Sequence, residues 1–481
     1  MKKTMKLPEN FILGAAASAW QLEGWGGKDK ESRHYMDAWY MATPELWHYG
    51  VGPTLAADFY NRYKTDVPMM AYVGLNAYRT SIDWTRFIKD YETGEVDEDG
   101  LRYYDDLIDR MIENGIEPML CLEHYELPVQ LFEKYGGWGS RHVIDCFVKY
   151  AEQAFKHFGH KVSKWFTFNE PIVVQTRVYL DSIRWPFEQN TQKWMQWNFH
   201  KILATAKVVS LFKDMGIDGK IGVILNPEVT YARSTAEHDL KAAHMYDLYF
   251  NRVYMDPHLK GKFPEELLID LKKHDIMFEF EEGDMEIIKN NTLTYVGLNL
   301  YYPHRLKARD TAWNDEIPFH PSYHYELFDL PGKKMNPFRG WEIYPKIIFD
   351  IGLRMRDEYE NVEWFVAESG MGVQNEQQYR NEDGIIQDDY RIDYIKEHLY
   401  WTLRAIEEGV NCTGYMLWAF MDNVSPQNAF KNRYGLVSID REDDLKRSIK
   451  KSGYWYKDVQ NNRAFEIDIK QYEFDNYKFD R

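Results

Sequence analysis

The sequence predicts a single (β/α)8 barrel that spans residues 1–481. Eight short apolar runs lie along the chain, and longer amphipathic stretches separate them. Runs that are apolar almost throughout are typical of parallel strands buried on both faces, and their alternation with helices indicates an α/β architecture. A prior of ~150 residues per domain would suggest about three domains, but barrels run from ~200 to over 400 residues as one unit. We find no linker that divides the chain.

The eight apolar runs are the expected strands. They lie at 11–20, 77–82, 117–122, 164–171, 220–226, 295–302, 363–369 and 414–420. An open, doubly wound sheet is the structural alternative. It would want a glycine-rich phosphate turn after an early strand, and none is convincing here.

Three of the intervening stretches show a clear helical period. In the first, the apolar residues from Leu101 to Ile112 fall on one face, and Gly115 stands where a glycine would end the helix. The stretches 140–159 and 389–409 behave in the same way. Active sites of barrels are built from the loops that follow the strands, so we expect the long segments 21–56 and 303–340 at the active-site face.

Composition argues against several classes of function. The net charge of −17 disfavours nucleic acid as a partner, because a phosphate backbone needs a basic footprint. Three widely spaced cysteines show no zinc or disulfide pattern, which favours a reducing compartment. No apolar run approaches the ~20 residues that span a bilayer, and residues 1–11 lack the apolar region of a signal peptide, so we expect no membrane association and a cytoplasmic location. The aromatic tail from residue 466 is expected on the outside or against another subunit, which leaves a homo-oligomer open.

Two glutamates follow expected strands that face each other across the barrel mouth. Glu170 ends the fourth strand and Glu368 ends the seventh. Cleavage of a glycoside with retention needs two carboxyl groups ~5–5.5 Å apart, one to protonate the leaving oxygen and one to attack the anomeric carbon. Aromatic residues make up 16% of the chain, and their flat faces suit stacking on sugar rings, although large barrels bury many aromatics in any case.

The motifs around these glutamates resemble glycoside hydrolase family 1, the family of β-glucosidases and 6-phospho-β-glycosidases. The matching segments cover nearly the whole chain and are FILGAAASAWQLEG (11–24), DFYNRYKTDV (58–67), YRTSIDWTRF (78–87), EHYELP (123–128), WFTFNEP (165–171), GLNLYY (297–302), GWEIYP (340–345), FVAESG (365–370), WAFMDN (418–423) and NRYGLVSID (432–440). The TFNEP segment is the most specific of them.

The resemblance implies a role for each matching residue. Glu170 matches the acid/base and Glu368 the nucleophile, although the family usually reads TENG where this chain has AESG. Arg79 and Tyr301 match the pair that orients the nucleophile and keeps it ionised. The remaining expected sugar contacts are Gln21, His124, Asn169, Asn299 and Trp418, with Asn169 at the 2-hydroxyl and Trp418 as the stacking platform. This mechanism needs no cofactor, and the 15 histidines show no HExxH-type metal pair.

One departure from the family bears on the sugar. Members that cleave unphosphorylated sugars usually carry Glu-Trp after MDNF, whereas this chain reads MDNV and has Ser425 at the glutamate position. An acid would repel a 6-phosphate, and a serine can donate a hydrogen bond to it. Family phospho-glycosidases follow that serine with Lys-x-Tyr. Tyr434 fits the tyrosine, but Asn432 occupies the lysine position, one residue after Lys431, so either residue is left open as the phosphate contact.

The sequence therefore predicts a retaining hydrolase of small β-glycosides, with 6-phosphorylated substrates favoured. A β-glycosidase for neutral sugars is the first alternative, because Ser425 and Lys431 can also be ordinary loop residues. A transglycosidase would use the same intermediate and remains open. A sugar-binding barrel without catalysis is the remote alternative, since such a protein would be expected to lose one of the two carboxylates. The choice between gluco and galacto sugars stays open.

Overall fold

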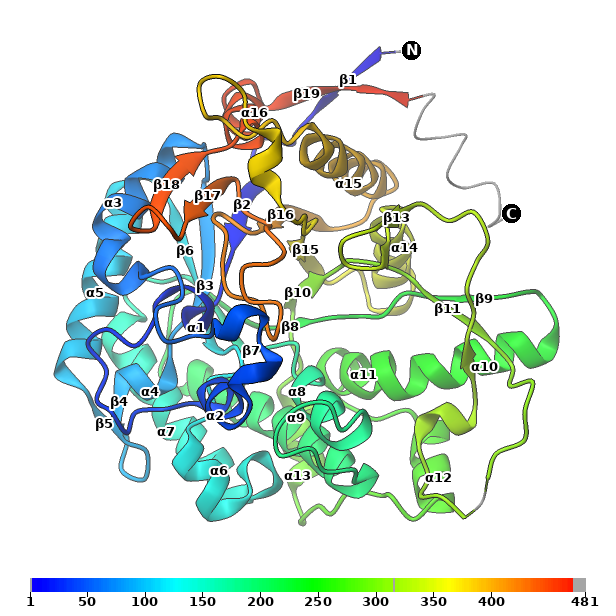
Figure 1. Cartoon of the computed structure of the whole chain (residues 1–481). Coiled ribbons are helices and arrows are strands. Elements are labelled where there is room, and N and C mark those ends of the chain that lie inside the picture. The colour runs from blue at the N-terminus through cyan, green and yellow to red at the C-terminus, as the bar shows by residue number, and fades with distance from the viewer. Residues whose placement is uncertain (1, 315, 470–481) are drawn as a thin grey trace.

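The computed structural model describes residues 2–314 and 316–469, and its centre is a closed parallel barrel of eight strands (Figure 1). The barrel strands are β2 (Ile12–Ala16), β3 (Ala77–Ser81), β6 (Glu117–Glu123), β7 (Lys164–Asn169), β8 (Lys220–Leu225), β10 (Tyr295–Asn299), β15 (Glu363–Ser369) and β16 (Cys412–Trp418). Each strand pairs with the next along the chain, and β16 closes the ring on β2. All eight predicted strands are present, and the predicted (β/α)8 fold is confirmed.

The barrel interior is filled by side chains rather than left as a pore. Its cluster of buried residues takes members from every strand: Ile12, Ala16, Ala77, Met119, Cys121, Phe166, Ile224, Tyr295, Phe365, Ala367, Met416 and Trp418. Gly14 shows how tightly β2 is enclosed. A Cβ atom there would lie 2.4 Å from the Met416 sulfur and 2.5 Å from the Ala77 carbonyl oxygen. Only glycine therefore fits this position without displacing a neighbouring strand.

Helices surround the barrel and connect its strands. The longer connecting helices are α3 (Phe59–Tyr72), α5 (Glu98–Glu113), α7 (Arg141–Phe158), α9 (Thr191–Asp214), α10 (Glu237–Asp247), α11 (Val253–Lys260), α14 (Ile347–Glu358), α15 (Asp389–Glu407) and α16 (Lys451–Asn462). The three predicted helices correspond to α5, α7 and α15. Gly115 has φ +72 just beyond α5, as expected of the glycine that ends a helix. No described helix is long and apolar enough to cross a membrane.

The connections between these elements carry further short helices and strands. The shorter helices are α1 (Ala19–Leu22), α2 (Tyr35–Ala42), α4 (Trp84–Phe87), α6 (Val129–Tyr135), α8 (Val173–Gln175), α12 (Glu265–Lys273) and α13 (Asp284–Asn290). The minor strands are β4 (Ile88–Asp90), β5 (Glu95–Val96), β9 (Thr230–Ala232), β11 (His304–Lys307), β12 (Glu326–Leu327), β13 (Met335–Asn336), β14 (Trp341–Glu342), β17 (Val437–Asp440) and β18 (Lys446–Ile449). The predicted loop 303–340 contains β11, β12 and β13.

The two ends of the described chain lie side by side. Strand β1 (Lys2–Lys6) pairs antiparallel with β19 (Ala464–Asp468), outside the barrel (Figure 1). This pairing was not anticipated from the sequence. It places the start of the tail, residues 466–468, on the outside of the fold, while residues 470–481 lie outside the described residues.

Candidate active site

Glu170 and Glu368 line one cavity of about 450 Å³ at the ends of the barrel strands. Glu368 belongs to β15, whereas Glu170 is the residue after β7 and has a left-handed backbone with φ +46. A residue other than glycine costs about 1–3 kcal/mol in such a conformation, and such strain clusters at active sites. The Glu170 amide donates to the carbonyl of Ile224 in β8, which helps to hold this turn.

Two donors hold the Glu368 carboxylate. Arg79, from β3, forms a buried ion pair with one oxygen, and the Tyr301 hydroxyl donates to the other at 2.8 Å. Burial raises the pKa of Glu368 to about 7, although Arg79 opposes the rise and nearby Glu170 adds to it. The sequence correctly placed Arg79 beside the carboxyl group. It did not anticipate that desolvation would outweigh the effect of Arg79, so that the pKa of Glu368 is raised rather than lowered.

Glu170 accepts hydrogen bonds from two other elements. The Tyr125 hydroxyl donates to one of its oxygens at 2.5 Å, and the Asn299 amide donates to the other at 2.9 Å. The same Asn299 amide also reaches Asn169 at 3.2 Å, and Arg79 donates to Asn169 at 3.0 Å. Asn169 and Asn299 therefore link the surroundings of the two carboxyl groups into one network.

The other predicted sugar contacts gather beside this network. Gln21, His124 and Trp418 line the cavity, and the rings of His124 and Trp418 lie 6.0 Å apart. Asn169 contacts His124 at 3.0 Å. The other ring nitrogen of His124 is buried and has no hydrogen-bond partner among the described residues. Burial lowers the pKa of His124 well below its usual value, so the ring is neutral. A neutral ring can accept a hydrogen bond from a hydroxyl or donate one to it.

The four residues predicted to contact a phosphate divide into two pairs. Ser425 and Tyr434 line the cavity. Lys431 is exposed and lies outside the cavity lining, and Asn432 is buried behind it, where its amide donates to the Asn428 side chain at 3.2 Å. The structure brings neither Lys431 nor Asn432 into the cavity, because the loop turns both away between Ser425 and Tyr434.

Several cavity residues were missed in the sequence. Tyr125 lies inside the EHYELP segment, so that motif was the signal for it. Trp341 lies inside the GWEIYP segment, which was likewise the signal for it, whereas no pattern singled out Arg339 just before that segment. The expectation that segments 21–56 and 303–340 lie at the active-site face is confirmed, since both contribute to the lining.

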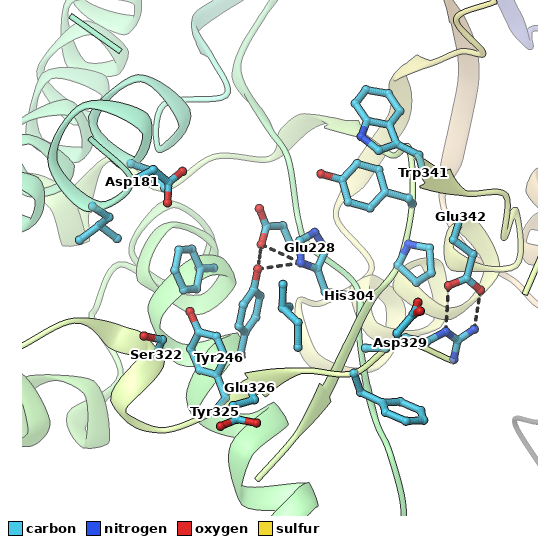
Figure 2. Close-up of a pocket in the computed structure, with 18 of the residues that line it drawn as sticks. Asp181, Glu228, Tyr246, His304, Ser322, Tyr325, Glu326, Asp329, Trp341 and Glu342 are labelled. Carbon is cyan, nitrogen blue, oxygen red and sulfur yellow. Dashed lines mark hydrogen bonds and ion pairs between the residues drawn. The ribbon is translucent and has the colours of Figure 1, made fainter. Parts of the chain in front are cut away.

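A larger cavity of about 770 Å³ adjoins the first one. The two share the lining residues Val173, Arg177, Glu228, Tyr302, His304 and Trp341. Figure 2 shows Glu228, Tyr246 and His304 joined by hydrogen bonds on its wall, with Trp341 at one side. The second cavity continues the first one beyond these shared residues.

Two clusters in the described part of the chain have the side chains of a metal site, and none of their residues lines either cavity. One is Glu92, His142 and Cys146; the other is Asp270, His274 and His324. Neither includes a residue that touches Glu170 or Glu368.

Comparisons with known proteins agree with this geometry. The model of the family "Glycosyl hydrolase family 1" matches residues 3–465. The chain belongs to glycosyl hydrolase family 1. This glycoside hydrolase is 43% identical to the 6-phospho-beta-glucosidase GmuD of Bacillus subtilis, over 96% of this chain and 98% of that protein. It is 33% identical to beta-glucosidase A of Acetivibrio thermocellus, over 95% of this chain and 99% of that protein. The family 1 β-glucosidase structure from Thermotoga maritima superimposes with a TM-score of 0.87 at 31% identity, covering 96% of this chain and 99% of that one.

Proposed function

We propose that this glycoside hydrolase cleaves 6-phospho-β-glycosides with retention, with Glu170 as acid/base and Glu368 as nucleophile. Both carboxyl groups line one cavity, and each is held by its own donors. Glu170 protonates the oxygen of the leaving group while Glu368 attacks the anomeric carbon. Water then enters with Glu170 as base and releases the sugar.

The Glu368 environment suits a nucleophile that changes charge during the reaction. Its carboxylate loses its negative charge when the glycosyl–enzyme bond forms, and Arg79 and Tyr301 then lose their ionic partner. Those donors stabilise the carboxylate before it attacks the sugar, and again when hydrolysis of the glycosyl–enzyme bond releases it. Gln21 and His124 line the cavity and offer hydrogen bonds to the ring hydroxyls, and Trp418 provides a flat apolar face. Asn169, assigned to the 2-hydroxyl, is bonded to His124 and is not itself among the lining residues.

The observation that carries the 6-phosphate assignment is Ser425. Its hydroxyl lines the cavity and bonds to no other described residue, so it is available to a ligand. No carboxylate stands at this position to repel an anion. The 43% identity to a 6-phospho-beta-glucosidase supports the same choice. Phosphorylated sugars do not cross membranes unaided, so this proposal goes together with a cytoplasmic location.

The deciding experiment compares four substrates at equal concentration. They are p-nitrophenyl β-glucoside, p-nitrophenyl β-galactoside and the 6-phosphate of each. The proposal expects higher kcat/KM on a 6-phosphate than on its neutral counterpart, and the faster of the two phosphates identifies the sugar. Faster cleavage of the neutral sugars would instead favour a β-glycosidase for unphosphorylated substrates. NMR of the first-formed product tests retention, and inversion at the anomeric carbon would refute the assigned mechanism.

A further inference from the structure

The cavity wall beside Tyr434 carries an arginine that no part of the catalytic mechanism uses. Arg339 lines the cavity together with Ser425 and Tyr434. Its guanidinium lies close enough to the Tyr434 hydroxyl to oppose the effect of burial, which raises the pKa of that hydroxyl. A positive charge therefore lies beside the Tyr434 hydroxyl, in a cavity that Ser425 also lines.

We propose that Arg339 is the cationic residue that binds the sugar 6-phosphate, with Ser425 and Tyr434 as its neutral partners. The inference rests on the proposed function, because it assumes a phosphorylated substrate. A phosphate monoester offers oxygens that the planar fork of an arginine can bind in pairs. The protein has a net charge of −17 and repels anions at long range, so a local cation has to offset that field.

Arg339 is not occupied by another charge. It pairs with no carboxylate within the described chain, and its Nε atom is buried without a hydrogen-bond partner. Its guanidinium instead lies 4.2 Å from the centroid of the Trp341 ring and donates a hydrogen bond to the neutral Tyr434 hydroxyl. A cation that is fixed in place but unpaired is suited to an anionic ligand.

The hairpin that carries Arg339 is fixed against the barrel. Strands β13 and β14 pair, and Gly340, with φ +70, closes the turn by donating to the Asn336 carbonyl at 2.9 Å. The Asn336 side chain donates to the carbonyl of Gly372 at 3.0 Å, and the Gln374 side chain donates to the carbonyl of Phe338 at 3.1 Å.

Gly372 in turn lies against the Tyr434 ring. A Cβ atom at that position would come within 2.7 Å of the Tyr434 hydroxyl oxygen. The hydrogen bonds that anchor the hairpin therefore also set Arg339 beside Tyr434. The resulting position depends on the backbone of three separate segments rather than on a flexible side chain alone.

The other cations near the cavity are less suitable. Arg391 also lies near Tyr434 but is buried and paired with Glu376 and Asp388. Arg177 is paired with Asp181 at 2.6 Å. Arg184 lies 5.9 Å from the centroid of the Tyr125 ring, beside the residue that bonds Glu170, and so belongs to the leaving-group side.

The test measures kcat/KM on a p-nitrophenyl β-glycoside and its 6-phosphate for the wild type, Arg339→Gln, Arg339→Lys and Lys431→Gln. Hydrogen bonds to a charged group contribute about 1.5–3 kcal/mol, so Arg339→Gln should lose about 10- to 150-fold on the phosphate. Its loss on the neutral sugar should stay within about threefold. Arg339→Lys keeps the charge without the fork and should recover part of the loss. Lys431→Gln removes one charge from the exposed side of the neighbouring loop and should cost less than about threefold on the phosphate.

The outcomes distinguish failure of the role of Arg339 from failure of the proposed function. Equal losses on both substrates in Arg339→Gln, or a phosphate-specific loss in Lys431→Gln instead, would overturn the role of Arg339. A wild type that prefers the neutral sugar would overturn the proposed function itself. A wild type that prefers the phosphate, with that preference intact in Arg339→Gln, would overturn only this inference. Circular dichroism of each variant checks folding, and if Arg339→Gln is unfolded, full phosphate preference in Arg339→Lys would count against the bidentate role.

Discussion

Replacing Tyr301 by phenylalanine tests how the protein sets the ionisation of Glu368. The Tyr301 hydroxyl donates to one oxygen of Glu368 at 2.8 Å, while Arg79 holds the other. Phenylalanine keeps the ring and removes only the hydroxyl. The change therefore removes one hydrogen bond that stabilises the ionised form of the carboxyl group and leaves the ion pair in place.

The expected change in the pKa of Glu368 follows from the free energy of the Tyr301–Glu368 hydrogen bond. A hydrogen bond to a charged group contributes about 1.5–3 kcal/mol, and one pKa unit corresponds to about 1.36 kcal/mol. The pKa of Glu368, which burial raises to about 7, should therefore rise by about one to two further units. Only the ionised carboxylate attacks, so activity is lost as the pH falls through this pKa. At about pH 6 the variant should have kcat/KM about 10- to 100-fold below that of the wild type.

The assay is the pH profile of kcat/KM, which reports groups of the free enzyme. A 2,4-dinitrophenyl glycoside is the best substrate, because its leaving group needs no proton and the profile then reflects Glu368 alone. In Tyr301→Phe the acid limb should move to higher pH, and the deficit should shrink as the pH rises. Tyr302→Phe is the matched control. Tyr302 lines the same cavity, but its ring stacks on that of Trp341, with 5.0 Å between the ring centroids. An acid limb at the same pH in Tyr301→Phe and the wild type would refute the reasoning.

Three further predictions concern the carboxyl groups and the loop behind them. Glu368→Gln should reduce turnover by about 10,000-fold or more while the circular dichroism spectrum is retained, and near-normal activity would exclude its role as nucleophile. Glu170→Ala should lose about 100- to 10,000-fold on an alkyl glycoside but far less on the dinitrophenyl substrate, and equal losses would argue against general-acid catalysis. Buried Lys450 pairs with Glu376 and, at 2.9 Å, with Asp422. Lys450→Met should therefore lower the free energy of unfolding by about 3–5 kcal/mol in a denaturant titration, and a loss below about 1 kcal/mol would show that these carboxylates find other partners.

The fold was predictable because its main signal is local. Each barrel strand is buried on both faces, so it leaves an apolar run that can be read without knowing its neighbours, as in 363–369. The helix α5 is equally visible, since its apolar face and Gly115 lie within one short stretch. The pairing of β1 with β19 was missed, because the two strands lie at opposite ends of the sequence and neither carries a continuous apolar run.

The site was predictable where motif and strand end coincide. Glu170, Glu368 and three residues that bond them were singled out by their segments, namely Arg79, Asn299 and Tyr301. Tyr125, which also bonds Glu170, was missed although its segment was noted. Lys431 was a wrong candidate for the cavity, because the orientation of a loop residue depends on a turn that the sequence does not specify. The net rise in the pKa of Glu368 was missed for a related reason. Burial is a property of the whole surroundings, whereas the opposing charge of Arg79 could be inferred from one residue.

The placement of Arg79 and Arg339 bears on how one site can hold a carboxylate pair and an anionic substrate together. Arg79 is fully buried and forms an ion pair with Glu368, so it cannot also neutralise a phosphate. A phosphate that approached Glu368 closely would raise the pKa of that carboxyl group further and suppress the nucleophile. The proposed position for the phosphate, between Arg339 and Tyr434, supplies a separate positive charge for it. Arg339→Gln should therefore weaken phosphate binding. It should also move the acid limb of the kcat–pH profile for the phosphorylated substrate to higher pH. The acid limb on the neutral sugar should stay where it is in the wild type. A shift on both sugars would mean that Arg339 acts on Glu368 directly and not through the substrate.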